Sequence, residues 1–287
     1  MNTDTLKYLK CPVCHAEGLR RDDNAVKCVN SHAFNVARQG YIDLLLKAGK
    51  RPEGDSLAMV EARARFLASG TYAPIADLIC RTAIPHLRSL SVPTPVCLDL
   101  GGGTGYYLDA LRLCFKSQNI TPSSILGDVS IYAARRAARI LTDTLVVRMD
   151  TWQQIPLVGS SVDVGIIVFA PRNAIEIARV MRDTGRLLVV TPAEDHLAGV
   201  MKLFGVVGQE SNKREHLLNS LSPYFHSVES NRLRYEVTLT RDQALDVLSM
   251  GPNARHIDIE DVRSKLHALN AIVTLVDVYL DSFAPNL

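Results

Sequence analysis

The sequence has no long apolar run, little net charge and a single tryptophan. None of its hydrophobic runs approaches the ~20 residues that a transmembrane helix needs. Met1 to Lys10 has no apolar core of the kind found in a secretory signal. We therefore expect a cytoplasmic protein without a membrane span. A net charge of +2 excludes a strongly basic coat for nucleic acid, although residues 1–65 have a local excess of Lys and Arg.

What remains is the composition of an ordinary globular chain, with 47% hydrophobic and 22% charged residues. Its 287 residues are enough for one large domain and one small domain. Three of its six cysteines cluster near the start. The other three, Cys80, Cys97 and Cys114, are scattered, and in a cytosolic chain we expect them to be buried apolar thiols.

The clustered cysteines belong to a metal-ligand pattern. Cys11 and Cys14 form a Cys-x-x-Cys pair, Cys28 follows, and His32 lies four residues beyond it. Three thiolates and one imidazole in two short loops are the ligand set of a tetrahedral structural zinc ion. A redox Cys-x-x-Cys is the alternative, but it would not need Cys28 and His32. His15 is a competing neighbour whose spacing from Cys14 fits a ligand poorly.

A segment this small cannot fold on an apolar core alone, whereas zinc contributes roughly 10–16 kcal/mol to such units. We expect residues 1–46 to form a zinc ribbon, closed by a strand around Phe34 and Val36. The polar segment 47–55 would then be a linker to one α/β domain, residues 47–287.

A buried strand that ends in an acid and a glycine run is the second pattern. Val96 to Leu100 has the apolar run of a parallel strand, and a helix follows the glycines. Such a turn lets a ligand approach the backbone, and the helix start offers N–H groups to an anion. A dinucleotide site has Gly-x-Gly-x-x-Gly, whereas Asp99, Gly101, Gly103 and Gly105 give Asp-x-Gly-x-Gly-x-Gly. This spacing resembles motif I of S-adenosylmethionine-dependent methyltransferases. A glycine-rich turn in some other α/β enzyme is the alternative.

Strands and helices alternate along the rest of the chain. The expected strands cover residues 125–128, 145–149, 162–169, 186–191, 227–239 and 271–280. The expected helices cover residues 56–67, 75–87, 106 onward, 131–141, 173–182, 242–250 and 259–269. This alternation predicts an α/β fold with a parallel, doubly wound sheet, and the last two strands predict the antiparallel pair typical of methyltransferases.

Ligands of such sheets bind at the carboxyl ends of the strands, which selects candidate site residues. Asp128 ends the second strand and can accept both ribose hydroxyls, or it can cap a turn. Asp150 ends the third strand, as an adenine contact or as a cap for the next turn. The loop after the fourth strand, which faces the methyl group, supplies the catalytic candidates Phe169, Pro171, Arg172 and Asn173. Asn173 is equally placed to cap the next helix.

Together these segments resemble the RlmA family, the 23S rRNA guanine-N1 methyltransferases. The matching segments span nearly the whole chain and are the Cys-x-x-Cys…Cys-x-x-x-His ribbon, Gly40-Tyr41, Met59…Ala62-Arg63…Phe66-Leu67…Gly70-x-Tyr72, the glycine loop, Phe169-Ala170-Pro171 and Thr191-Pro192…His196-Leu197. The loops Gly101–Gly105, Phe169–Asn173 and Met250-Gly251-Pro252 favour the type II branch, which includes the tylosin-resistance methyltransferase. The resemblance implies a Rossmann-like class I methyltransferase with an N-terminal zinc ribbon that positions RNA.

The resemblance also implies a substrate, cofactors and contacts. Cofactor contacts are implied at Tyr72, Gly103, Thr104 and His196; without the resemblance, Tyr72 would be a packing residue and His196 a helix cap. The implied cofactors are S-adenosylmethionine and one structural Zn²⁺. The implied substrate is guanine N1 in a hairpin loop of domain II of 23S rRNA, free or in a ribosomal assembly particle. The resemblance extends to macrolide resistance and leaves room for a homodimer.

Two other functions fit part of the sequence. The catalytic domain alone would suit a methyltransferase of a small molecule such as a quinone or an antibiotic, but the ribbon argues against it. An RNA-binding protein with an inactive methyltransferase domain is argued against by the intact Asp99, Asp128 and glycine loop. No acid lies in the Phe169–Asn173 loop, so the sequence identifies no base for the N1 proton. A departure from many methyltransferases, Arg182–Gly185 in place of Pro-Gly-Gly, is expected to affect only a surface turn.

Overall fold

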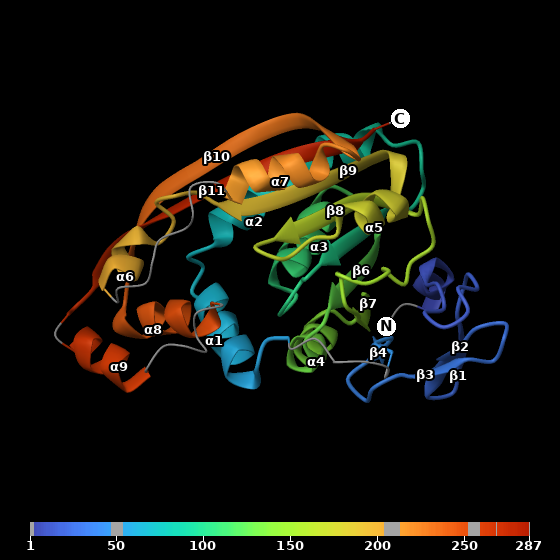
Figure 1. The fold of residues 1–287 in the computed structure, drawn as a ribbon, viewed down its shortest axis with the longest axis horizontal. Helices are drawn as coiled ribbons and strands as arrows, with labels where there is room; N and C mark the ends of the chain where they lie inside the picture. The colour runs from blue at the N-terminus through green and yellow to red at the C-terminus, as the bar shows by residue number, and fades with distance from the viewer. Residues whose placement is uncertain (1–2, 47–53, 204–212, 252–258, 268, 287) are drawn as a thin grey trace.

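The computed structural model describes residues 3–46, 54–203, 213–251, 259–267 and 269–286, and its main body is an eight-stranded sheet (Figure 1). In spatial order the strands are β10 (Phe225–Leu239), β11 (Ile272–Pro285), β9 (Met181–Pro192), β8 (Val162–Val168), β5 (Val96–Leu100), β6 (Ser123–Asp128), β7 (Leu145–Arg148) and β4 (Tyr41–Asp43). Neighbours from β9 to β4 are parallel, while β11 pairs antiparallel with both β9 and β10. This confirms the doubly wound sheet with a final antiparallel pair.

Helices cover both faces of the sheet. The helices of the described residues are α1 (Leu57–Ala68), α2 (Ala73–Ser89), α3 (Tyr106–Ser117), α4 (Ile131–Ile140), α5 (Ala174–Val180), α6 (Ala198–Leu203), α7 (Lys213–Leu221), α8 (Arg241–Met250) and α9 (Ile259–His267), of which α9 packs on α8. One buried cluster joins the sheet to α2, α3 and α8, and a second joins its other face to α5 and α7. Every residue of β5 and β8 is buried, as expected for parallel strands covered on both faces. Across the described helices, no segment combines the length and apolar character of a membrane span.

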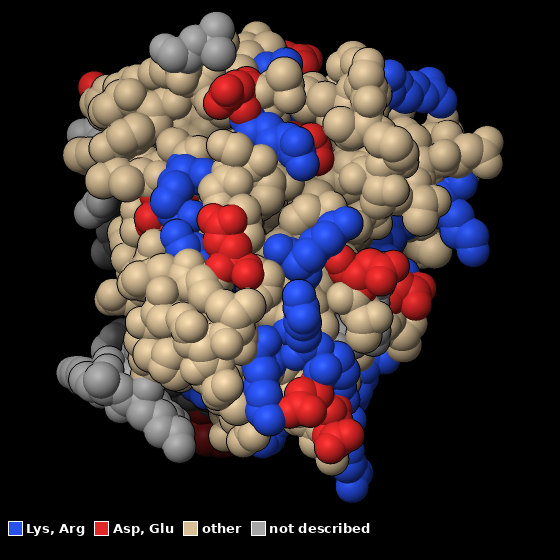
Figure 2. All heavy atoms as spheres, turned by 90° about the vertical axis from the view of Figure 1, so that its right-hand side faces the viewer, with Lys and Arg blue, Asp and Glu red and all other residues tan. Residues whose placement is uncertain are grey.

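The N-terminal ribbon consists of a short 3-10 helix, η1 (Thr3–Tyr8), and a three-stranded antiparallel sheet of β1 (Arg20–Asp22), β2 (Ala25–Lys27) and β3 (Ala33–Asn35). It lies beside the β4 edge of the main sheet (Figure 1). Figure 2 shows Lys and Arg side chains gathered on the lower part of this side of the molecule. The strand expected around Phe34 and Val36 is present as β3, which ends at Asn35, and Val36 forms an isolated bridge with Ile42.

The ribbon is anchored on the α/β body. Leu6 and Leu9 belong to the same buried cluster as Leu157, and the Lys10 N–H donates to the Pro156 carbonyl at 2.9 Å. The chain then enters the main sheet as β4, where Asp43 pairs with the buried Arg148 of β7 at 3.0 Å. Residues 41–43 thus lie in the main sheet, although we expected them within the ribbon. The expected domain boundary at 46/47 and most of the linker fall outside the described residues.

Several other elements differ from the sequence expectations. The helix expected over 173–182 ends at Val180, because Met181 already pairs with Val162 at the start of β9. Residues 182–185 therefore lie within a strand rather than in a surface turn. Helices α6 and α7 were not expected. The helix expected over 259–269 is α9, and residue 268 lies outside the described residues.

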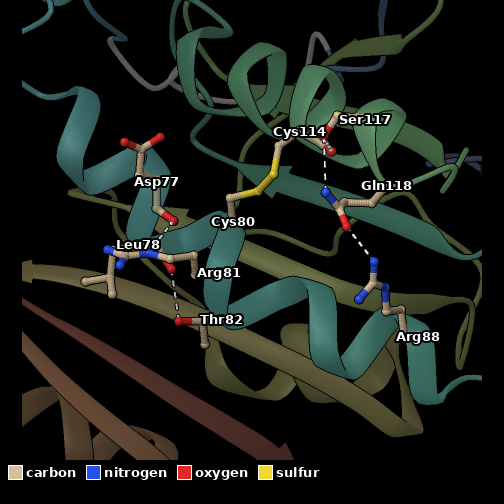
Figure 3. Close-up of a disulfide and its surroundings, with 9 residues drawn as sticks. All are labelled: Asp77, Leu78, Cys80, Arg81, Thr82, Arg88, Cys114, Ser117 and Gln118. Carbon is tan, nitrogen blue, oxygen red and sulfur yellow. Dashed lines mark hydrogen bonds between the residues drawn. A yellow bond between two sulfur atoms is a disulfide. The ribbon is translucent and has the colours of Figure 1, made fainter.

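The expectation of three scattered thiols is wrong for two of the three cysteines. Cys80 of α2 and Cys114 of α3 are joined in a disulfide (Figure 3), with their Cα atoms 6.7 Å apart. Sequence spacing could not show this pairing, because it depends on which faces of the two helices meet. Cys97 is a free, buried thiol in β5, as expected.

Candidate functional site

A cavity of about 290 Å³ opens at the carboxyl ends of β5, β6 and β8. Its wall residues are Gly54, Asp55, Arg63, Leu67, Tyr72, Asp99, Gly101, Gly102, Gly103, Thr104, Tyr106, Tyr107, Asp128, Val129, Thr151, Val168, Phe169, Ala170, Pro171 and Met250. The cavity therefore lies at the carboxyl ends of the parallel strands, where the sequence analysis placed the candidate site. Eight of the predicted site residues contribute to this wall: Tyr72, Asp99, Gly101, Gly103, Thr104, Asp128, Phe169 and Pro171.

The glycine loop is tied to the end of the next strand. Gly103 has φ +55°, a left-handed conformation that glycine adopts without steric cost, and its N–H donates to Asp128 Oδ2 at 2.8 Å. A Cβ on Gly102 would lie 2.7 Å from the Leu126 side chain and 2.8 Å from Asp99 Oδ2. These two positions therefore require glycine, and the loop is shaped before any ligand arrives.

Two acids of the cavity wall, Asp99 and Asp128, have raised pKa values. Asp99 is 1% exposed and its Oδ2 has no hydrogen-bond partner among the described residues. Burial, and secondly the charge of Asp128, raise the pKa of Asp99 to about 7. Burial also raises the pKa of Asp128, against two backbone hydrogen bonds that lower it. An orphaned carboxylate oxygen in a largely enclosed site fits a positively charged ligand group, as the ammonium and sulfonium of S-adenosylmethionine would be.

Asp128 makes the contacts of a turn cap, and its ribose contact stays a prediction. Its Oδ1 accepts from the Ser130 N–H at 2.8 Å, and its Oδ2 accepts from Gly103, so it caps the turn after β6. It also lines the cavity. Because an ionised carboxylate has about four acceptor sites, two backbone bonds leave capacity for ribose hydroxyls.

Tyr72 and His196 form a buried pair beside the cavity. The Tyr72 hydroxyl lies 2.9 Å from His196 Nε2, and the Asp277 N–H donates to His196 Nδ1 at 3.3 Å. Burial lowers the pKa of His196 to about 4, so the ring is neutral at pH 7. Because Nδ1 accepts, we assign the ring proton to Nε2, which then donates to Tyr72. The Tyr72 hydroxyl hydrogen is thereby left for another acceptor. Only Tyr72 of the pair lines the cavity.

The loop after β8 turns an aromatic ring toward this pair. Phe169 has φ +52°, which is strained for a residue with a side chain, and it is 39% exposed. Its ring centroid lies 5.9 Å from that of Tyr72 and 5.5 Å from that of His196. Together with Pro171, this exposed ring gives the cavity mouth a flat, apolar side.

Four other predicted site residues lie outside the wall. The Asp150 carboxylate accepts from the Trp152 N–H at 3.0 Å, and its neighbour Thr151 lines the cavity instead. Asn173 caps α5 and also donates to the Trp152 carbonyl. Both match the capping alternatives. Gly105, with φ +84°, is the N-cap residue that precedes α3, and Arg172 has no hydrogen-bond or ion-pair partner among the described residues. Ligand contacts at these positions stay predictions.

The sequence reading assigned no role to several residues of the wall, above all Arg63. Its Nη2 donates to the Met250 carbonyl at 2.8 Å, and its Nη1 pairs with Asp55. Arg63 is on α1, which packs against α8 near the other end of the chain. The only signal in the sequence was its place in the segment that resembles the RlmA family.

The ribbon holds a compact set of metal ligands. One ligand atom from each of Cys11, Cys14, Cys28 and His32 lies within 4.8 Å of the others, and His15 is not part of the set. Two thiolates at 2.3 Å from a tetrahedral zinc ion would be about 3.8 Å apart, and the Cys14 and Cys28 sulfurs are 3.7 Å apart. Hydrogen bonding, first from the Ala16 backbone, lowers the pKa of Cys14 to about 6, which favours the thiolate a metal requires. The geometry and donor set fit a structural Zn²⁺ site.

The strand order, the glycine loop and the cavity define a class I S-adenosylmethionine-dependent methyltransferase with an N-terminal zinc ribbon. Residues 9–51 match the family described as "RlmA, N-terminal". The 23S rRNA (guanine(748)-N(1))-methyltransferase of Streptomyces fradiae is 37% identical over 273 residues, covering 95% of this chain and 94% of that protein. A relative from Micromonospora griseorubida is 35% identical over 96% of both chains, and one from Bacillus subtilis is 27% identical over 88% of both. The chain belongs to the RlmA family of 23S rRNA (guanine-N1)-methyltransferases.

Proposed function

We propose that the protein transfers the methyl group of S-adenosylmethionine to N1 of a guanine in a hairpin loop of domain II of 23S rRNA. The observation that carries this is the match of 95% of the chain to a methyltransferase named for guanine 748 of 23S rRNA. The guanine would then be the counterpart of position 748.

The chain's own residues would bind and align the reactants. Bound S-adenosylmethionine supplies a methyl group already activated on a sulfonium, so alignment is the main task of the protein. Asp128 would bind the ribose, Asp99 would compensate positive charge, and the glycine loop would allow close approach. Phe169 and Pro171 would contact the flat target base, which must be splayed out of its loop. The N1 proton must leave during the transfer, and among the described wall residues the carboxylates are those of Asp55, Asp99 and Asp128.

The ribbon offers a surface for the RNA backbone. An open groove of about 440 Å³ on it is lined by Thr3, Asp4, Leu6, Lys7, Leu19, Arg20 and Arg21. Arg20 and Arg21 are exposed and have no ion-pair partner among the described residues. Free guanidinium groups are suited to phosphate contacts, which fix the position of a nucleic acid without reading its sequence. We therefore assign RNA placement to the ribbon.

The test is a methyl-transfer assay on two substrate pools. Purified protein and tritiated S-adenosylmethionine are incubated with total ribosomal RNA and, separately, with a metabolite extract. We expect label in RNA, 1-methylguanosine after digestion, and one primer-extension stop in 23S rRNA, because N1 methylation blocks base pairing. A Gly103→Val preparation is the control for contaminating activity. Ribose or exocyclic methylation alone, or label only in metabolites, would contradict the proposal, and the latter would favour the small-molecule alternative.

Three finer assignments need their own measurements. Comparing naked 23S rRNA with ribosomal assembly particles in the same assay tests which form is the substrate. Light scattering of the purified chain tests the homodimer. The type II resemblance predicts that expression in a macrolide-sensitive strain raises its tolerance of tylosin, and fractionation should place the protein in the cytoplasm with its ribosomal substrate.

A further inference from the structure

The charges of the cavity wall are unequal. Among the described wall residues there are three carboxylates, Asp55, Asp99 and Asp128, and one guanidinium, Arg63. S-adenosylmethionine presents two positive groups, the sulfonium and the ammonium, and one negative group, the methionyl carboxylate. Three acids of the described wall are available to pair with the positive groups, whereas Arg63 is the one cationic side chain of that wall available to the carboxylate.

The glycine loop does not meet this need by itself. The N–H groups of Gly101 and Gly102 donate to the Gly127 carbonyl at 2.8 and 3.2 Å. The Gly103 N–H donates to Asp128, and the Gly105 N–H donates to the Gly102 carbonyl at 2.9 Å. These four donors are therefore already used, three of them by the end of β6 and one within the loop. The N–H groups of Thr104 and of the first turn of α3 remain, but they are neutral, so a positively charged partner for the carboxylate has to come from outside the loop.

Arg63 lies on the cavity wall beside the glycine loop. Its Nη1 is 3.7 Å from the position that a Cβ would take on Gly103, so the guanidinium faces the loop across the cavity. Two of its N–H groups are used, one by Asp55 and one by the Met250 carbonyl. A guanidinium has five N–H donors in a planar fork, so three remain for a ligand. The Met250 carbonyl also fixes the side chain to α8, which holds the fork in place.

We propose that Arg63 is the binding residue for the methionyl carboxylate of S-adenosylmethionine. The proposal rests on the proposed function only in that the cavity must bind this cofactor. The ion pair with Asp55 shows that this guanidinium can pair with a carboxylate at the cavity wall.

The test compares two ligands that differ by one group: S-adenosylhomocysteine and its decarboxylated analogue, 5′-deoxy-5′-(3-aminopropylthio)adenosine. Calorimetry measures the affinity of each, so no methyl transfer is involved. A charge-assisted hydrogen bond to a carboxylate corresponds to roughly a tenfold difference in affinity or more. We expect the wild type to bind the decarboxylated ligand at least tenfold more weakly. We expect the affinities of Arg63→Gln for the two ligands to lie within threefold of each other, because the variant lacks the guanidinium that only the carboxylate-bearing ligand can pair with.

Two further variants make the comparison specific. Arg136→Met removes an exposed positive charge on α4, away from the cavity, and should keep the wild-type ratio between the ligands. Arg63→Lys keeps a charge without the planar fork and should retain part of the ratio; it also serves if Arg63→Gln does not fold, as judged by thermal melting. A wild-type ratio in either folded Arg63 variant would overturn the role of Arg63 and leave the proposed function intact. A wild type that binds neither ligand would overturn both.

Discussion

Lowering the pH should destabilise the folded protein through His196. Burial holds the pKa of His196 at about 4, against an ordinary value of 6.5 in the unfolded chain. At pH 7.5 the ring is almost entirely neutral in both states, so the difference in pKa has almost no effect on stability. Below pH 6.5 His196 of the unfolded chain binds a proton, whereas the folded ring stays neutral, so stability is lost as the pH falls from 6.5 toward 4. At pH 5 the pH is 1.5 units below the pKa of the unfolded ring, so the free energy of unfolding is lower by about 2 kcal/mol.

The readout must isolate His196 from the buried acids. Asp99, whose pKa is raised to about 7, acts in the opposite direction, because its folded form binds a proton first as the pH falls. We therefore compare the wild type with His196→Gln, whose amide can still donate to Tyr72 but does not titrate. Urea unfolding at pH 7.5 and pH 5 should show the wild type losing about 2 kcal/mol relative to the variant. A difference that stays within about 0.5 kcal/mol across this range would refute the buried, neutral ring.

Three more outcomes follow from the site, the ribbon and the disulfide. Asp128→Ala should weaken S-adenosylmethionine binding at least tenfold by calorimetry, because the ribose loses its acceptor; unchanged affinity would reject that role. Cys11→Ser with Cys14→Ser should lose zinc, unfold residues up to about 45 in hydrogen exchange and lose most rRNA methylation, with cofactor affinity nearly normal; methylation that survives zinc loss would reject RNA placement by the ribbon. Reducing Cys80–Cys114, which are separated by 34 residues, should lower the unfolding free energy by about 4 kcal/mol in urea titrations, and a Cys80→Ala variant should not respond to the reductant.

The parts of the fold that could be predicted have local signals. Val96–Leu100 and Val162–Val168 are buried on both faces, so their apolar runs are readable without knowing their neighbours. The four metal ligands are set by spacing within two short loops. β4 lacks such a signal, because three residues are too short for a periodicity, and only pairing with β7 makes them a strand.

Choosing residues at the carboxyl ends of the strands predicted several residues of the cavity wall, but not the direction of each side chain. Asp150 follows β7 as expected, yet its carboxylate turns to the Trp152 N–H, and Thr151 faces the cavity. Arg63 shows the opposite failure: it lies on the wall through a contact with Met250, 187 residues away in the sequence. Such contacts follow from helix packing, which no spacing within one segment encodes.

The buried cluster shared by the ribbon and the sheet limits how separable the ribbon is. Leu6, Leu9 and Val26 pack in the same cluster as Ile155 and Leu157 of the α/β body. Loss of zinc would therefore free the ligand loops and also uncover apolar surface on the body, at about 25 cal/mol for each Å² exposed. The cavity wall draws none of its described residues from 3–46, so cofactor binding should survive that loss even where the body becomes less stable. A zinc-free variant thus distinguishes two roles of the ribbon. If the ribbon only stabilises the enzyme, rRNA methylation by the variant should return at low temperature. If the ribbon positions RNA, methylation should stay low at every temperature.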